Sequence, residues 1–252
     1  MKEKLPMRHV HRPLLAVVIA LGLFAAACDD DGGGSSSTTD SDDSTETSNG
    51  GDLVGLFAVD AGQCADAGVT KGSYFRMVQP GGDPESGPFV DNVDAGCGDA
   101  SYTPLSPGTD GGLITGEYQP QPDPPFTGDN QGGATETITE PQAFFAIDFA
   151  VSTNEVDPQD GTDVPAPSVS AAADGSLSGD LRAWGVAYSG QFFNQGSPKP
   201  DGSQPGNTSG PTGTYNSSTG KYVLEWTSLI VGGPFDGFTG VWHLDGTFEE
   251  QT

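Results

Sequence analysis

The positions of the prolines constrain the fold of this chain more than any other sequence feature. Proline has no backbone N–H and interrupts both a helix interior and a central strand, so regular elements fit best between prolines. The longest proline-free windows after residue 50 are 53–79, 142–157, 168–197, 212–233 and 235–252. We therefore expect the regular structure to be concentrated in these windows.

Apolar residues in these windows recur at every second position, a period that is typical of strands. The pattern is clearest in the segments 145–151, 184–188, 222–226 and 242–248. No window carries the apolar stripe at i, i+3 and i+4 that an amphipathic helix requires. The sequence therefore predicts an all-β domain, a single antiparallel β-sandwich or jelly-roll-like fold.

Segments rich in proline and glycine separate the expected strands. Residues 104–125 and 196–213 predict long surface loops, because their composition favours turns and extended chain. The dipeptide Asp174-Gly175 and the segment 218–220, Ser-Thr-Gly, are predicted to be hairpin turns between flanking strands.

The N-terminus has the organisation of an export signal. Four basic residues precede an unbroken apolar run at 14–27, which ends in three alanines. This run is shorter than the about 20 residues that a membrane-spanning helix needs. Residues 1–27 therefore predict a cleaved signal peptide.

The segment 23–28, Leu-Phe-Ala-Ala-Ala-Cys, resembles the bacterial lipobox, in which small residues precede a cysteine that receives diacylglycerol. The resemblance implies that Cys28 is lipidated and anchors the protein to a membrane outside the cytoplasm. The alanines at 25–27 also fit the A-x-A pattern of ordinary signal cleavage, so soluble secretion is the alternative.

The cysteine count supports lipidation, because the chain has only Cys28, Cys64 and Cys97. Modifying the first leaves two thiols, which can pair in an oxidising compartment. A disulfide between Cys64 and Cys97 would close a loop of roughly 33 residues and stabilise the domain by about 3–4 kcal/mol. A redox role is disfavoured, since neither cysteine lies in a C-x-x-C motif or beside a basic residue.

A polar segment separates Cys28 from the expected domain. Residues 29–50 contain no apolar residue, so they cannot collapse into a core. As a flexible coil they would span roughly 25–30 Å. We therefore expect a signal peptide at 1–27, a lipidated cysteine with a disordered acidic tether at 28–50, and a β-rich globular domain at 51–252.

The formal net charge is −26, and loss of residues 1–27 makes it about −29, because four basic residues and one acidic residue leave. Nucleic-acid partners are excluded, since phosphate contacts need clustered Lys and Arg. Attraction to anionic lipid is excluded on the same ground, so a covalent anchor is the natural route to the membrane.

Three acidic residues could hold a calcium ion. Asp157, Asp160 and Asp163 surround a glycine turn and supply the oxygen ligands that calcium prefers. Their spacing of three differs from that of an EF-hand loop, so a solvated acidic loop is the alternative. Calcium is the one cofactor that the sequence suggests.

A group of aromatic and amide residues could bind carbohydrate. Trp184, Tyr188 and Asn194 lie within a short segment that also contains Phe192 and Phe193. Exposed aromatic rings beside amide groups can stack on sugars, whereas buried rings on one strand face would belong to the core. The first interpretation predicts an envelope carbohydrate as ligand.

No residue set identifies a catalytic centre. His243 is the only histidine after residue 27, which rules out an ordinary zinc site, and no G-x-S-x-G motif occurs. Glu225 and Asp148, each within an expected strand, are the carboxylates best placed to line a cleft. We therefore expect a non-enzymatic binding or structural module of the cell envelope, with a glycan hydrolase using paired carboxylates as the alternative.

Overall fold

The computed structural model describes residues 50–65, 70–126 and 135–251. Cys28, the signal segment and nearly all of the tether lie outside these residues. Within the described part no helix is both long and apolar enough to cross a membrane. The regular elements are β1 (Gly51–Asp52), β2 (Gly55–Val59), β3 (Gln63–Cys64), β4 (Thr70–Lys71), β5 (Tyr74–Asp83), β6 (Gly87–Phe89), η1 (Val93–Ala95), β7 (Thr103–Pro104), β8 (Gly112–Ile114), β9 (Gln142–Phe144), β10 (Ile147–Thr153), β11 (Ser168–Ala171), β12 (Ser176–Asp180), β13 (Trp184–Tyr188), β14 (Gln191–Asn194), β15 (Ser209–Tyr215), β16 (Lys221–Leu229), η2 (Gly233–Phe235) and β17 (Thr239–Glu250).

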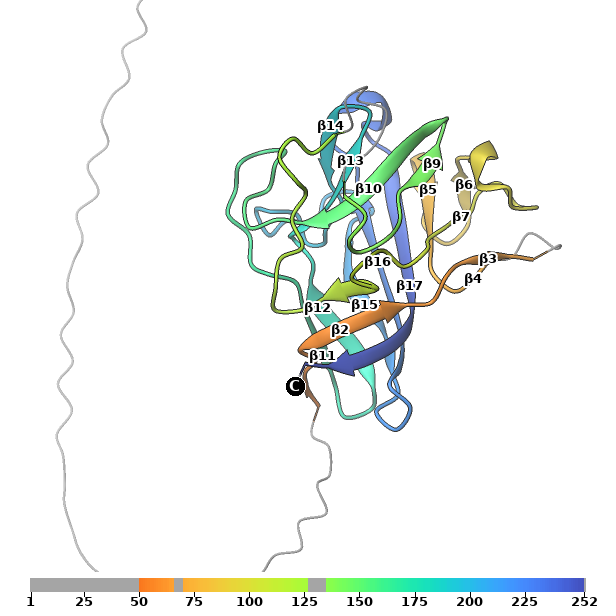
Figure 1. Cartoon of the computed structure of the whole chain (residues 1–252). Helices are drawn as coiled ribbons and strands as arrows, with labels where there is room; N and C mark the ends of the chain where they lie inside the picture. Colours follow the sequence, from red (N-terminus) through yellow and green to blue (C-terminus); the bar gives the residue numbers. More distant parts are fainter. Residues whose placement is uncertain (1–49, 66–69, 127–134, 252) are drawn as a thin grey trace, which may run out of the picture. The chain divides into compact units, whose positions relative to one another are not determined.

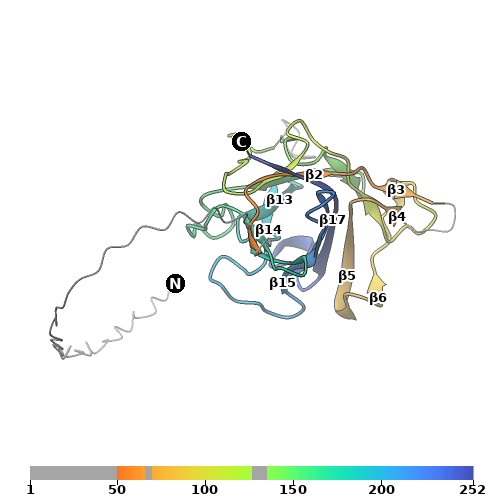
Figure 2. The same ribbon diagram turned by 90° about the horizontal axis from the view of Figure 1, so that it is seen from below.

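The strands form two main antiparallel sheets (Figure 1). The larger sheet follows the order β1-β11-β12-β15-β16-β17-β2-β8, and β5 joins it through β17 and carries β6 and β7. The smaller sheet has the order β14-β13-β10-β9. Seen from below, β2, β13, β15 and β17 surround the interior (Figure 2). The predicted all-β antiparallel sandwich is confirmed.

Strand β17 is the centre of the large sheet. One edge pairs with β16, while the other edge is shared by β5 and β2. At the junction the buried Ser73 hydroxyl bonds both the N–H and the carbonyl of Asp245, at 2.9 and 3.1 Å. Gly246 follows, and any Cβ there would lie 1.7 Å from the carbonyl oxygen of Ala58. The change of partner strand therefore requires glycine.

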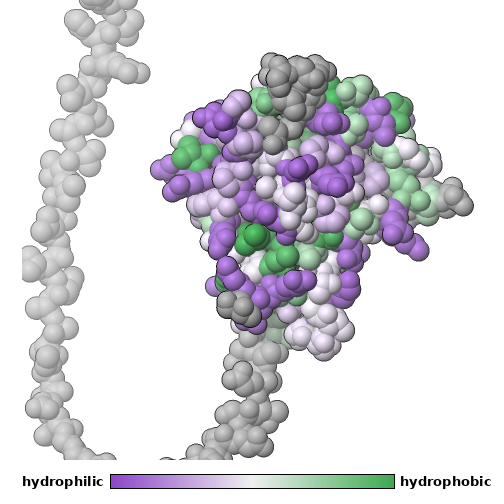
Figure 3. All heavy atoms as spheres, viewed as in Figure 1, coloured by the Kyte–Doolittle hydropathy of each residue, from purple (hydrophilic) through white to green (hydrophobic). Residues whose placement is uncertain are grey.

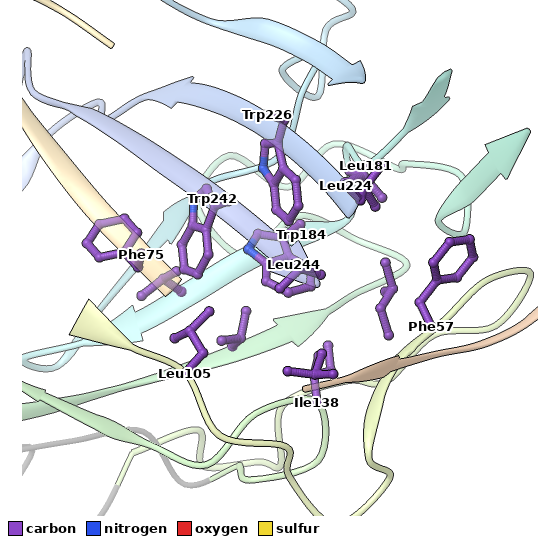
Figure 4. Packing of buried hydrophobic residues seen from close by; sticks show 14 of the residues in the cluster. Phe57, Phe75, Leu105, Ile138, Leu181, Trp184, Leu224, Trp226, Trp242 and Leu244 are labelled. Atoms are coloured by element: carbon purple, nitrogen blue, oxygen red, sulfur yellow. The ribbon is translucent and has the colours of Figure 1, made fainter. Parts of the chain in front are cut away.

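The core lies between the sheets and follows from the period-2 pattern. Trp184, Trp226 and Trp242 are almost completely buried and pack ring against ring, with centroids 5.1–5.9 Å apart. Figure 4 shows the three indoles together with Phe75 and Leu244. On the face shown in Figure 3, by contrast, most described residues are hydrophilic and the hydrophobic patches are small.

Two predicted turns and the predicted disulfide are present. Gly175 joins β11 to β12 with φ of 82°, and Gly220 joins β15 to β16 with φ of 70°, both values that suit glycine. Cys64 and Cys97 are paired, with their Cα atoms 5.1 Å apart. The disulfide links the β3–β4 hairpin to the loop that follows η1.

The prediction of one strand over 145–151 is wrong at its start. Phe145 and Ala146 form a two-residue turn between β9 and β10, with φ of 51° and 59°. The strand proper begins at Ile147, and from there Phe149 and Val151 are buried as expected. The alternation of apolar residues continues through this turn, and neither Phe145 nor Ala146 is a residue type that indicates a turn.

Candidate functional site

The aromatic platform predicted around Trp184, Tyr188 and Asn194 does not exist. Trp184 has no exposed surface, and the exposed fractions of Tyr188 and Asn194 are only 7% and 4%. The Tyr188 hydroxyl donates to the carbonyl of Phe144 at 2.9 Å. All five residues of β13 are buried, because both faces of this strand are covered. These residues belong to the core.

The three aspartates proposed for calcium do not converge. Asp157 is buried, and one of its carboxylate oxygens accepts the backbone N–H groups of Gln159 and Asp160. Asp160 in turn accepts the N–H of Thr162. No group of three metal-binding side chains is found in the described part of the chain. The carboxylates of Asp157 and Asp160 hold a turn, so the predicted calcium site at Asp157, Asp160 and Asp163 is wrong.

Asp157 also belongs to a buried polar network. Its second carboxylate oxygen accepts the Asn194 amide at 2.7 Å. The Lys199 ammonium donates to the backbone carbonyl of Asn194 at 2.9 Å and to the Ser228 hydroxyl at 2.7 Å. Burial lowers the pKa of Lys199 to about 8 and raises the pKa of Asp157. This network connects β14 to β16 and to the loop 155–163, and it offers no open surface.

The open polar site lies instead on the outer face of the large sheet. Tyr74 on β5 pairs in register with His243 on β17, and His243 pairs with Glu225 on β16. These outward positions alternate with core residues along each strand. A second row of outward-facing residues lies two residues further along each strand. It consists of Arg76, Val241, Thr227 and Ser209, which pair with one another in register.

Two turns wall this surface and make it a groove of about 550 Å³, here called the outer groove. Asp83, Pro84 and Glu85 form one wall, in the turn from β5 to β6. Residues 206–208, before β15, form the other. The Asn207 side chain donates to the carbonyl of Gly82 at 2.9 Å and so joins the two walls.

Tyr74 and Glu225 line the outer groove, and His243 lies between them in the strand register. His243 Nδ1 lies 2.7 Å from Glu225 Oε1, and the imidazole stacks on the Tyr74 ring with centroids 4.4 Å apart. The hydrogen bond from His243 lowers the pKa of Glu225. Burial, with the Glu225 charge as second cause, raises the pKa of Tyr74 to about 12. Tyr74 is therefore a neutral donor beside an ionised acceptor at neutral pH.

Arg76 supplies the cation of the outer groove. Its guanidinium carbon lies 3.3 Å from the centre of the Phe89 ring and 4.2 Å from that of Tyr102. It donates to the Ser101 hydroxyl at 2.9 Å. Within the described residues Arg76 makes no ion pair, so the aromatic rings fix its position while its charge stays available.

The outer groove thus combines fixed donors, a fixed acceptor and the partly exposed ring of Tyr74, a combination suited to binding hydroxyl-rich molecules. His243 and Glu225 were each singled out by sequence, but their pairing was not predicted. The sequence analysis did not identify Tyr74, Arg76 or the two walls.

Comparison of the chain with protein-family models, curated proteins and solved structures found no match.

Proposed function

We propose that this protein is an exported lipoprotein, anchored through Cys28, whose β-sandwich domain binds an envelope glycan in the outer groove. The observation that carries the proposal is the row of Tyr74, His243 and Glu225, in which hydrogen bonding and stacking fix a donor and an acceptor on a rigid sheet. Polar groups held by rigid strands bind with little loss of conformational entropy. The groove volume lies in the usual range of ligand pockets, about 300–1,000 Å³.

The charges of the outer groove favour neutral or amino sugars. Asp83, Glu85 and Glu225 contribute three carboxylates, and Arg76 contributes one cation. The whole chain is strongly acidic, with a formal net charge of −26. A uronic acid would meet this negative field, whereas an amino sugar would be attracted by it.

The same carboxylates support binding over glycoside hydrolysis. A hydrolase needs one carboxyl group whose raised pKa keeps it protonated as general acid. The hydrogen bond from His243 lowers the pKa of Glu225, and the N–H groups of Ser86 and Glu85 lower that of Asp83. Asp157 has a raised pKa, but it is buried in the polar network away from the outer groove.

The test is to screen the purified protein against immobilised neutral, amino and uronic oligosaccharides and to titrate the best ligand by calorimetry. Glu225→Gln should weaken binding about tenfold, since it removes a charged acceptor. Glu140→Gln is the matched control, because Glu140 is exposed outside the outer groove, and it should bind like the wild type. Failure of every glycan to bind, or equal binding by E225Q, would contradict the proposal. Release of reducing ends that is lost in E225Q would favour the hydrolase.

A further inference from the structure

A second cavity lies between the two sheets, separate from the outer groove. Its volume is about 40 Å³, and Gln195 is the one amide among lining residues that are otherwise aromatic or aliphatic. Seven of its eleven lining residues are aromatic, including Phe75, Phe149, Phe193 and Trp242. Protein cores are close-packed, and a void leaves the surrounding atoms without contacts on one side. An apolar void among so many large side chains is a place for an apolar ligand to bind.

The edge of this apolar pocket is formed by a segment rich in glycine. Phe235, in η2, lines the pocket and packs against Phe144 and Tyr188 with ring centroids 5.8 and 5.9 Å apart. Gly232, Gly233 and Gly237 surround it with φ between 66° and 83°. Phe235 is only partly buried, so it lies at the solvent side of the pocket.

Apolar surface continues outward from Phe235. The Phe145 ring stacks on it with centroids 6.1 Å apart, although the exposed fraction of Phe145 is 46%. The β9–β10 turn holds Phe145 there, and the Asp94 carboxylate fixes that turn by accepting the N–H of Ala146 at 2.6 Å. A molecule whose end enters the pocket can therefore lie across Phe235 and Phe145.

We propose that the apolar pocket binds the end of a straight alkyl chain, and that the bound molecule is a single-chain amphiphile with a neutral or cationic head group. An apolar cavity of about 150 Å³ binds a benzene ring. This pocket, at about 40 Å³, is much smaller, so a chain end fits it better than a ring. Asp94 and Asp236 each accept a backbone N–H at 2.6 Å beside Phe145 and Phe235, so the rim carries carboxylates. They would repel an anionic head group.

The experiment is to add 1-alkanols of increasing length to the purified protein and to follow tryptophan fluorescence and thermal unfolding. Trp242 lines the pocket, so its emission should change on binding. Affinity should rise about fourfold per methylene until the pocket is full. At low salt an alkyltrimethylammonium should bind at least as tightly as the alkanol of equal length, and the alkanoate more weakly.

Two variants locate the binding. Val186→Phe fills the pocket and should weaken alkanol binding at least tenfold, whereas Val54→Phe, at an exposed position outside it, should bind like the wild type. If V186F does not fold, Phe145→Ser changes an exposed ring and should weaken binding several-fold. Any of three results would overturn the proposal. The first is no response to any alkanol, and the second is undiminished alkanol binding by V186F and F145S. The third is binding of phenol together with an alkanol affinity that does not change with chain length. Glycan binding in the outer groove is measured separately, so a negative result for the apolar pocket does not contradict the proposed function, and the reverse also holds.

Discussion

Lys199 is a basic residue whose chemistry is determined by burial. Only 7% of the residue is exposed, and its ammonium donates to a backbone carbonyl and to the Ser228 hydroxyl. Asp157 and Asp201 are the charged groups that face it and favour its protonated form. Desolvation outweighs both carboxylates, and the pKa of Lys199 falls from 10.5 to about 8. A buried charge of this kind makes stability depend on pH.

The direction of that dependence follows from proton binding. Between pH 8 and 10.5 the folded protein has released the Lys199 proton, while the unfolded chain still binds it. Unfolding in this range takes up a proton, so Lys199 makes the free energy of unfolding rise with pH. Lys199→Met should abolish this rise, as measured by urea unfolding at steps across the range. Lys71→Met, at an exposed position, should leave the slope unchanged. A K199M slope equal to that of the wild type would contradict the expectation.

The β9–β10 hairpin shows how one element departs from its own sequence preferences. A two-residue turn with positive φ at both positions is normally made by Asn-Gly or Asp-Gly. Here Phe145 and Ala146 occupy those positions. A left-handed conformation costs about 1–2 kcal/mol for a residue with a Cβ. The turn therefore holds Phe145 at the rim of the apolar pocket at the expense of stability.

Relief of this strain is measurable. Ala146→Gly should raise the free energy of unfolding by about 0.5–1 kcal/mol, because glycine adopts positive φ without a steric penalty. A higher urea midpoint with an unchanged m-value is the expected result. Ala173→Gly is the control, since Ala173 is an exposed turn residue without positive φ, and it should be neutral or slightly destabilising. An A146G protein less stable than the wild type would show that the turn is unstrained.

At the scale of the whole molecule, local pattern predicted most of the long strands, but it missed short ones such as β8, within the predicted loop 104–125, and it did not predict which strands are neighbours. The alternation at 222–226 and 242–248 correctly indicated that Trp226 and Trp242 lie on the buried faces of their strands. Along β13 alternation could not separate the carbohydrate interpretation from the core interpretation, because both faces of this strand are covered and a period of two no longer distinguishes inside from outside. The pairing of His243 with Glu225 depends on strand register, and the walls of the outer groove come from segments about 120 residues apart, joined by Asn207. Contacts between segments so far apart in the chain cannot be predicted from a single sequence.

The route by which the whole molecule reaches a membrane is a testable consequence of its charge. With a formal net charge of −26, the chain is repelled by anionic lipid, so the proposed membrane anchor requires acyl chains on Cys28. The wild-type protein should incorporate labelled fatty acid and stay in the membrane fraction through a high-salt wash. Cys28→Ser should carry no label and appear in the soluble fraction. Cys97→Ser, which removes the disulfide partner of Cys64, should keep both label and membrane fraction. Equal partition of C28S and wild type would favour ordinary signal cleavage at the alanines.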